Sequence, residues 1–139
     1  MAEDSICVYE ECEVKDNKPR CLAANQLLRT ISENGRHFFR TGDFVAFLEL
    51  DSRGRVWFTD DYTREQIYTH YERTRWRNFS RGGTMRELIV ALRKYIVYGT
   101  RLGSKQLGPF PSYNCGGDPW GYGEGMEVVR EKAKELGLI

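Results

Sequence analysis

The sequence lacks the segments that would place a protein in or across a membrane. None of its apolar runs approaches the roughly 20 residues that a helix needs to cross a bilayer. Its first residues, Met1 to Asp4, are acidic and lack the basic flank and apolar stretch of a secretory signal. We therefore expect a cytoplasmic protein without membrane contacts.

Closely spaced cysteines are also absent. The four cysteines lie at positions 7, 12, 21 and 115, whereas zinc knuckles and ribbons hold their ligands in pairs about two to four residues apart. A structural zinc site that also uses His37 is the alternative, but thiols in the cytoplasm stay reduced by default. The sequence therefore predicts free thiols, no metal and no cofactor.

Known catalytic and nucleotide-binding motifs are missing as well: there is no phosphate loop, dinucleotide fingerprint, H-E-x-x-H or nucleophile elbow. His70 is the best general-base candidate, with Asp60, Asp61 and Glu65 near it in sequence to orient it. Cys115, beside two glycines, is a candidate nucleophile. The structural alternative makes the acidic pair a solvated loop that starts a turn. No catalytic residue is assigned.

What is present has the composition of an ordinary globular domain. Of the 139 residues, 40% are apolar and 29% charged, which argues against global disorder. Aromatic residues make up 13%, and their large rings help a small domain to build a core. We expect a single domain over residues 1–139.

Three segments have helical periodicity. Residues 19–34 carry one apolar stripe and end at Asn34-Gly35. A second helix begins at a T-x-x-E capping box, Thr84 to Glu87, and stops at Gly99. A C-terminal helix over residues 126–137 follows. Residues 103–125 form a loop rich in glycine, proline and aromatic residues.

The clearest β signal is a hairpin of residues 44–50 and 56–59, joined by a turn at Gly54. A third strand over 66–71 and a short fourth one near 76–79 follow. Large apolar residues on both faces of the hairpin indicate that both faces are covered, one of them by helices. We predict an α+β fold in which a small antiparallel sheet of three to four strands packs with about three helices in two layers.

Charge is unevenly distributed along the chain. Residues 1–17, predicted as an acidic arm or an edge strand, carry six acids against one lysine, a net charge of −5. Residues 73–105 carry nine basic residues against one acid, a net charge of +8. Such asymmetry bears on the partners of a protein.

Within the basic stretch, residues 73–83 alternate arginines with aromatic rings. Single-stranded nucleic acids bind to such surfaces, because guanidinium groups contact phosphates and rings stack on bases. The structural alternative places the arginines on the solvent face of a strand and Trp76 in the core. The named nucleic-acid-binding motifs are absent. The candidates for binding a partner or a nucleic acid are Arg73, Arg75, Trp76, Arg77 and Arg81.

A second candidate surface is the loop over residues 103–125. Trp120 and Tyr122 are suited to anchor a protein interface, because aromatic rings bury much area at low entropic cost. The alternative folds these rings back over the domain. Loops longer than about a dozen residues are often functional, which favours a partner site.

Residues 76–86, W-R-N-F-S-R-G-G-T-M-R, and the preceding Ile67 to His70 resemble stretches in small uncharacterised proteins of tailed phages and prophages. The resemblance covers the middle third of the chain and transfers no catalytic role. It implies an accessory protein of a mobile element that acts in the host cytoplasm. Such proteins often dock onto host machinery, including defence complexes.

The sequence therefore predicts a non-catalytic binding module that docks on a host protein or nucleoprotein, with inhibition of an antiviral system as one such role. A single-stranded nucleic-acid-binding protein is the first alternative. A small hydrolase or transferase that uses His70 is the second.

Overall fold

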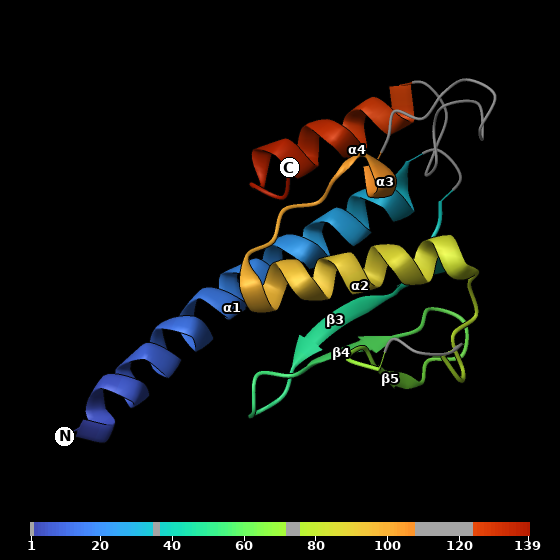
Figure 1. The fold of residues 1–139 in the computed structure, drawn as a ribbon. Coiled ribbons are helices and arrows are strands. Elements are labelled where there is room, and N and C mark those ends of the chain that lie inside the picture. The colour runs from blue at the N-terminus through green and yellow to red at the C-terminus, as the bar shows by residue number, and fades with distance from the viewer. Residues whose placement is uncertain (1, 35–36, 72–75, 108–123) are drawn as a thin grey trace.

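The structure is a computed structural model, and it describes residues 2–34, 37–71, 76–107 and 124–139. Helices and strands alternate in blocks, as expected for an α+β fold (Figure 1). In chain order the elements are α1 (Ala2–Glu33), β1 (Arg40–Thr41), β2 (Phe44–Val45), β3 (Phe47–Leu50), β4 (Val56–Thr59), β5 (Gln66–Tyr68), α2 (Gly83–Tyr98), α3 (Ser104–Leu107) and α4 (Glu124–Glu135). The α+β prediction is confirmed.

Strands β3, β4 and β5 form an antiparallel sheet in that order. Leu48 pairs with Phe58, and Phe58 pairs with Ile67. Because side chains alternate across a strand, these three residues share one face of the sheet. All three are buried, with exposed fractions of 6% or less. Through these three side chains the sheet contributes to the hydrophobic core.

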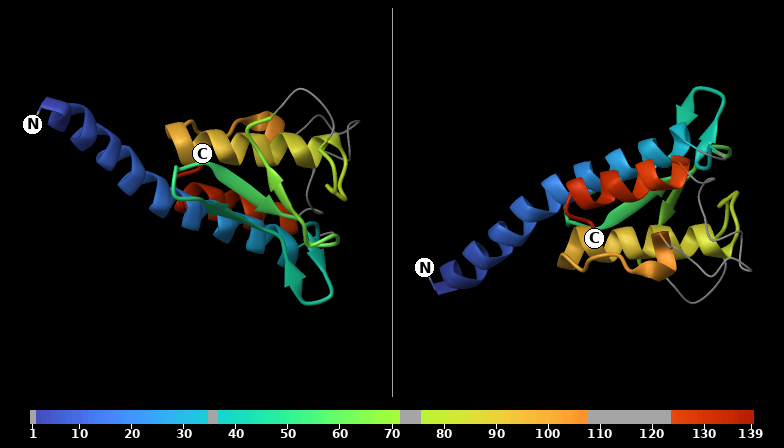
Figure 2. Two further views of the ribbon diagram at one scale, coloured as in Figure 1. Left: turned by 90° about the horizontal axis from the view of Figure 1, so that it is seen from below. Right: turned by 90° about the horizontal axis from the view of Figure 1, so that it is seen from above.

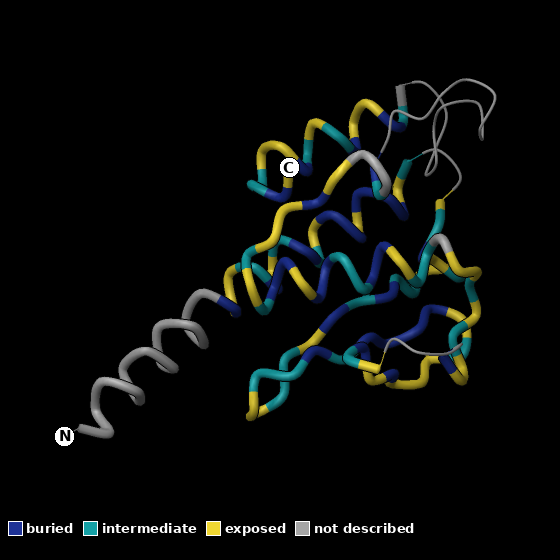
Figure 3. The backbone as a smooth tube through the Cα atoms, viewed as in Figure 1, coloured by how far each residue is buried: buried dark blue, intermediate teal, exposed yellow. Residues whose placement is uncertain are grey.

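Helices α1 and α2 lie side by side on this buried face, and α4 packs on the other side of α1 (Figure 2). The inner surfaces of both helices are buried (Figure 3). The predicted apolar stripes supply these surfaces: Leu27, Leu28 and Ile31 of α1, and Leu88, Leu92 and Ile96 of α2, are at most 1% exposed. None of the described helices or loops lies on the opposite face of the sheet, which was expected to be covered as well.

The strands differ from the prediction at their ends. The strand expected over residues 44–50 is divided at Ala46, whose N–H donates to the Phe39 carbonyl at 2.9 Å. Residues 44–45 instead pair with 40–41 in a separate hairpin. Strand β5 stops at Tyr68. Residues 76–79 form a turn with Asn78 at φ 69°, so the expected fourth strand is wrong there.

The N-terminal residues also differ from the prediction, because they are helical. Residues 1–17 were predicted as an arm or an edge strand, but α1 begins at Ala2 and runs for 32 residues with Pro19 inside it. No glycine or proline interrupts residues 2–18, and Glu3 and Asp4 lie in the first turn, at the positive end of the helix dipole. The N-terminal turns of α1 extend beyond the rest of the described chain (Figure 1). Despite this length, no described helix is apolar enough over a sufficient stretch to span a membrane.

Glycines set the limits of α2. Gly82 is its N-cap and α2 begins at Gly83, so the helix starts before Thr84, which was predicted to cap it. At the other end, Gly99 adopts φ 77° and its N–H donates to the Tyr95 carbonyl at 2.8 Å. This left-handed cap is the one predicted from the sequence.

The outer edge of β3 is covered by α1. The side-chain amide of Asn25 accepts the N–H of Leu48 at 2.7 Å and donates to the Leu48 carbonyl at 2.8 Å. The Cys21 thiol donates to the same carbonyl at 3.4 Å. A side chain of α1 thus takes the place of a further strand at this edge.

Candidate functional site

The sheet carries a cluster of rings on its face away from the helices. Trp57 of β4 pairs with Tyr68 of β5, and their ring centroids are 5.1 Å apart. The ring of His70 stacks on Tyr68 at 5.2 Å with an angle of 25°. The guanidinium carbon of Arg55 lies 5.9 Å from the centre of the Tyr68 ring. We call these four residues the aromatic face; Tyr68, 37% exposed, is at its centre.

Asp51, in the turn between β3 and β4, holds two members of the aromatic face. Its carboxylate accepts the indole N–H of Trp57 at 3.0 Å and the Nε–H of Arg55 at 2.8 Å. It also accepts the backbone N–H groups of Arg53 and Arg55, both at 2.9 Å. The Trp57 hydrogen bond and these other donors hold the pKa of Asp51 well below its usual value, despite the opposing effect of burial. The carboxylate therefore keeps its charge and holds the Trp57 indole and the Arg55 guanidinium.

His70 has a structural role in the same cluster. Its Nε2 accepts the N–H of Val56 at 3.0 Å, where a strand partner would otherwise lie. Meanwhile the Val56 carbonyl accepts the N–H of Thr69 at 3.3 Å. To act as a base through Nε2, His70 would have to release the buried amide of Val56, and unpaired buried amides are costly.

Asp60 begins the loop between β4 and β5 and is fully buried. One carboxylate oxygen accepts the N–H groups of Tyr62 and Thr63, both at 2.9 Å. The other accepts the N–H of Ser80 at 2.8 Å and its hydroxyl at 3.0 Å. Burial alone would raise the pKa of Asp60, but these hydrogen bonds outweigh it and the pKa lies below its usual value. Asp60 closes its own turn and ties it to the segment before α2.

Asp61 is also fully buried and joins three parts of the chain. It forms an ion pair with Arg81, whose Nε lies 3.3 Å from the second carboxylate oxygen. It accepts the hydroxyl of Thr41, in β1, at 2.7 Å. Arg81 also donates to the Arg40 carbonyl at 3.4 Å. The expectation that Asp60 and Asp61 are a solvated acidic pair is wrong. Both carboxylates are buried, and both bind residues that are distant in the sequence.

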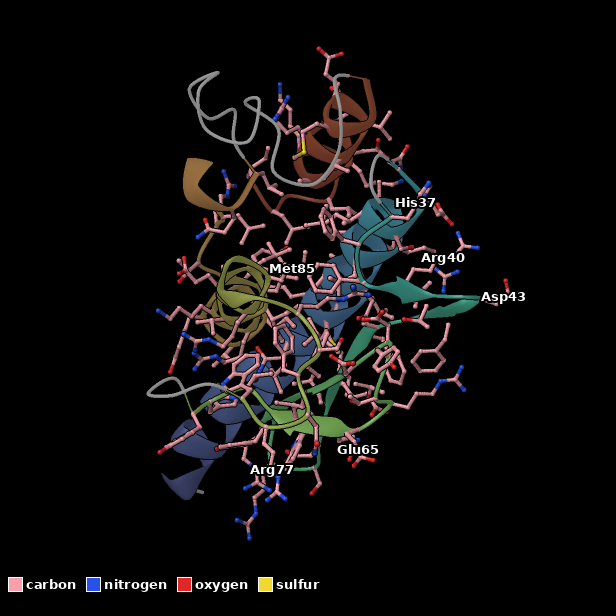
Figure 4. The ribbon with its side chains drawn as sticks, turned by 90° about the vertical axis from the view of Figure 1, so that its right-hand side faces the viewer. His37, Arg40, Asp43, Glu65, Arg77 and Met85 are labelled. Carbon is pink, nitrogen blue, oxygen red and sulfur yellow. The ribbon has the colours of Figure 1, made fainter. Side chains whose placement is uncertain are left out.

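The predicted arginine stripe is divided by these contacts. Arg81 serves Asp61 and is half-buried, so it is not an exposed binding residue. Trp76 is 5% exposed; its indole donates to the Tyr71 carbonyl, and its ring meets Phe79 edge-on at 5.4 Å. A buried ring cannot stack on a base, so Trp76 is a core residue. Arg77 is exposed at the sheet end of the molecule (Figure 4).

Several candidates lie outside the described residues: Arg73, Arg75, Trp120, Tyr122 and Cys115. Of the candidates for a metal site, His37 is exposed, with Nδ1 3.0 Å from the Ser32 carbonyl oxygen. The described residues contain no group of three side chains that could hold a metal ion. Burial first, and then the charge of Glu49, raise the pKa of the Cys21 thiol to about 11. This thiol stays protonated at neutral pH.

Comparison with known proteins identifies a family and a relative of this chain. Residues 15–139 match the model of the YoqU family. The chain belongs to the YoqU family. One YoqU relative, the "SPbeta prophage-derived uncharacterized protein YoqU" of Bacillus subtilis (strain 168), is 32% identical over 119 residues, which cover 83% of this chain and 79% of the relative. No solved structure matches the chain.

The expected resemblance to prophage proteins is thus confirmed, and the YoqU match extends well beyond the middle third that suggested it. The matched region includes the five strands of the described residues and the later turns of α1. The aromatic face was not predicted as a site. Alternation along the strands put Tyr68 and His70 on one side, but the sequence does not show whether that side is covered.

Proposed function

We propose that this chain is a non-catalytic binding module of a mobile element, and that it docks on a host protein or nucleoprotein through the aromatic face. The observation that carries the proposal is the fixed arrangement of Trp57, Tyr68, His70 and Arg55. Asp51 holds Trp57 and Arg55, and the Val56 amide holds His70, before any partner arrives. Rings fixed in this way lose little conformational freedom on binding, which favours affinity.

The chemistry of the former catalytic candidates also favours binding. Nε2 of His70 is occupied by a backbone amide, and the carboxylates of Asp60 and Asp61 are occupied by several donors each. Groups that hold the fold together are poorly placed to exchange protons with a substrate. Glu65, near them in sequence, is exposed at the sheet end of the molecule (Figure 4).

The surroundings of the aromatic face indicate the chemistry of the partner. Glu49 lies directly opposite Trp57 in the strand register, and Gln66 donates to Glu49 at 2.9 Å. Together with Arg55, these polar groups border the rings. A partner that inserts an apolar or aromatic side chain and offers one charge of each sign fits this arrangement. The prophage origin of the relative supports a host target, and we favour an antiviral complex.

A pull-down with matched tyrosine variants tests the proposal. Tagged wild-type chain, Tyr68→Ala and Tyr98→Ala are incubated with Bacillus subtilis lysate, with and without nuclease. Tyr98 is 72% exposed at the end of α2, so its variant controls for the loss of a surface tyrosine. Circular dichroism confirms that each variant is folded.

A stoichiometric protein that survives nuclease treatment, binds wild type and Tyr98→Ala, and is lost with Tyr68→Ala would support docking through the aromatic face. Equal capture by all three chains would exclude this face. Recovery of nucleic acid alone, abolished by nuclease, would favour a nucleic-acid-binding protein instead.

A further inference from the structure

A hollow of about 280 Å³ lies beside the aromatic face. The described residues that line it come from the three strands of the sheet and from the turn after β3: Glu49, Leu50, Asp51, Trp57 and Gln66. The strand register places Glu49 on one side of Trp57 and Tyr68 on the other. The hollow therefore shares Trp57 with the aromatic face. We call it the Trp57 hollow.

One wall of the Trp57 hollow is an aromatic ring that is already held in place. The indole N–H of Trp57 donates to the Asp51 carboxylate at 3.0 Å, and the ring centroid lies 5.1 Å from that of Tyr68. Among aromatic side chains, Trp attracts cations most strongly, because the face of its π system is negative. A cation that enters the hollow therefore meets a ring that does not have to rearrange.

The two carboxylates of the hollow differ in how their charge is balanced. Asp51 forms an ion pair with Arg55 at 2.8 Å. Among the described residues, Glu49 has one hydrogen-bond partner, the neutral side-chain amide of Gln66, which donates to one carboxylate oxygen at 2.9 Å. The second oxygen of Glu49 is not used in this bond, and the side chain is exposed. Glu49 thus places an unbalanced negative charge beside the Trp57 ring.

This combination of a ring and a charge selects a cationic occupant. A phosphate or an acidic peptide would lie beside Glu49 and Asp51, and like charges repel. An apolar side chain would cover the Glu49 carboxylate without pairing it, which costs free energy. A metal ion needs several ligands, and the described residues contain no group of three side chains that could hold one.

Of the two cationic side chains, arginine fits both contacts at once. Its guanidinium is planar, so it can stack on the Trp57 ring while its N–H groups donate to a carboxylate from the edge of the plane. Gln66 occupies one oxygen of Glu49 and leaves the second for this bond. The ammonium of lysine is a compact and strongly hydrated charge without a face that stacks.

We propose that the Trp57 hollow binds the side chain of an arginine that the docking partner presents. This assignment, which rests on the proposed docking through the aromatic face, names the residue that the partner places beside Trp57. Pockets for whole small molecules have volumes of about 300–1,000 Å³. The hollow lies just below this range, as a site for one side chain does.

Titration of the ¹⁵N-labelled full chain with N-acetyl-arginine amide tests the hollow without the partner. The two ends of this probe are neutral, so its charge is that of the guanidinium. We expect a saturable shift of the Trp57 indole N–H resonance, assigned with Trp57→Phe, and a dissociation constant on the order of 10 mM. N-acetyl-citrulline amide, which has a similar shape without the charge, should bind about fivefold more weakly or less, and N-acetyl-lysine amide should also bind more weakly.

Glu49→Gln keeps the shape of the side chain and removes its charge, so it should weaken binding of the arginine probe about fivefold. Glu65→Gln is the matched control, because Glu65 is an exposed carboxylate that precedes β5 and does not line the hollow. It should bind the probe within about twofold of wild type. Both residues are exposed, so the fold is expected to survive either change.

Three results would overturn the proposal: no saturable shift up to about 100 mM probe, equal binding of the arginine probe and either of the other two, or equal weakening by Glu49→Gln and Glu65→Gln. Failure of docking would look different. If a captured partner is lost with Tyr68→Ala but kept with Glu49→Gln, docking stands and the arginine assignment is wrong. If wild type binds the arginine probe but captures no partner through the aromatic face, the arginine site stands and docking is wrong.

Discussion

The two turns at the ends of β4 are both built around aspartates, but the aspartates bind partners at different distances along the chain. Among the described residues, the Asp51 carboxylate, before β4, binds partners within six positions of itself, on the hairpin to which it belongs. Asp60 and Asp61, after β4, bind residues about 20 positions away in both directions along the chain. The first turn arranges a local surface. The second turn holds separate segments of the fold together.

The largest effect is expected from Asp60→Ala. The change leaves the N–H groups of Tyr62, Thr63 and Ser80 without their acceptor, so we expect the free energy of unfolding to fall by about 3–5 kcal/mol. Urea unfolding measures it. Glu65→Ala, at an exposed carboxylate of the same loop, is the control and should change stability by less than about 0.5 kcal/mol. Similar losses for the two variants would contradict the assigned role of Asp60.

Arg81→Ala comes next. It leaves the buried carboxylate of Asp61 without its cation, and because Arg81 keeps some exposure we expect a loss of about 2–3 kcal/mol, below the range for fully buried pairs. Arg77→Ala, an exposed arginine of the same segment, should lie within about 0.5 kcal/mol of wild type. If both variants lose the same amount in urea unfolding, Arg81 does not connect the segments.

Asp51→Ala should be milder, because every partner that it loses is local. We expect a smaller decrease in the melting temperature than for Arg81→Ala, together with a shifted indole N–H resonance of Trp57 in a ¹H–¹⁵N spectrum. Binding of a partner through the aromatic face should weaken more than stability does. If Asp51→Ala melts at a lower temperature than Asp60→Ala, the turn before β4 contributes more to stability than the turn after it, contrary to this prediction.

The smallest expected effect is that of pH on stability, because the free energy of unfolding should hardly change near neutrality. The pKa of Asp60 is lower in the folded chain than its usual value of 3.8, so its ionised form favours folding. This contribution is complete above the usual value and is lost as the pH falls from 3.8 through the lowered folded-state pKa. Urea midpoints should therefore be nearly constant from about pH 6 to 8 and decrease in acid. In Asp60→Asn the urea midpoint should decrease less steeply in acid. If it decreases as steeply as in wild type, Asp60 does not cause the loss of stability in acid.

The same contrast explains what the sequence could predict. Features that depend on near neighbours were found: the strand over residues 56–59, the Gly99 cap and the apolar stripe of α2. The turn at Asp60-Asp61 was foreseen, because aspartates accept N–H groups two and three residues ahead. Its burial was not, since that depends on Ser80 and Arg81, which the sequence does not place beside it.

Other errors have the same origin. Ala46 divides a continuous apolar run because its N–H pairs with Phe39, a residue with φ 64° that no pattern marks. Trp76 fits a stacking platform in composition, and only its contacts with Phe79 and Tyr71 show that it is buried. Arg86, Lys94 and Arg101 belong to one basic stretch of the sequence, but they line one pocket because the chain reverses at Gly99.

The amide of Asn25 has a consequence for how copies of this chain can associate. A sheet that can accept a strand at both edges can grow without limit, as fibrils do, whereas one with a single accepting edge stops after one addition. Because Asn25 already occupies the N–H and carbonyl of Leu48, a foreign strand cannot pair with these two groups at the β3 edge of the sheet. One polar side chain on α1 thereby protects this edge, even though the sheet exposes aromatic rings on its open face.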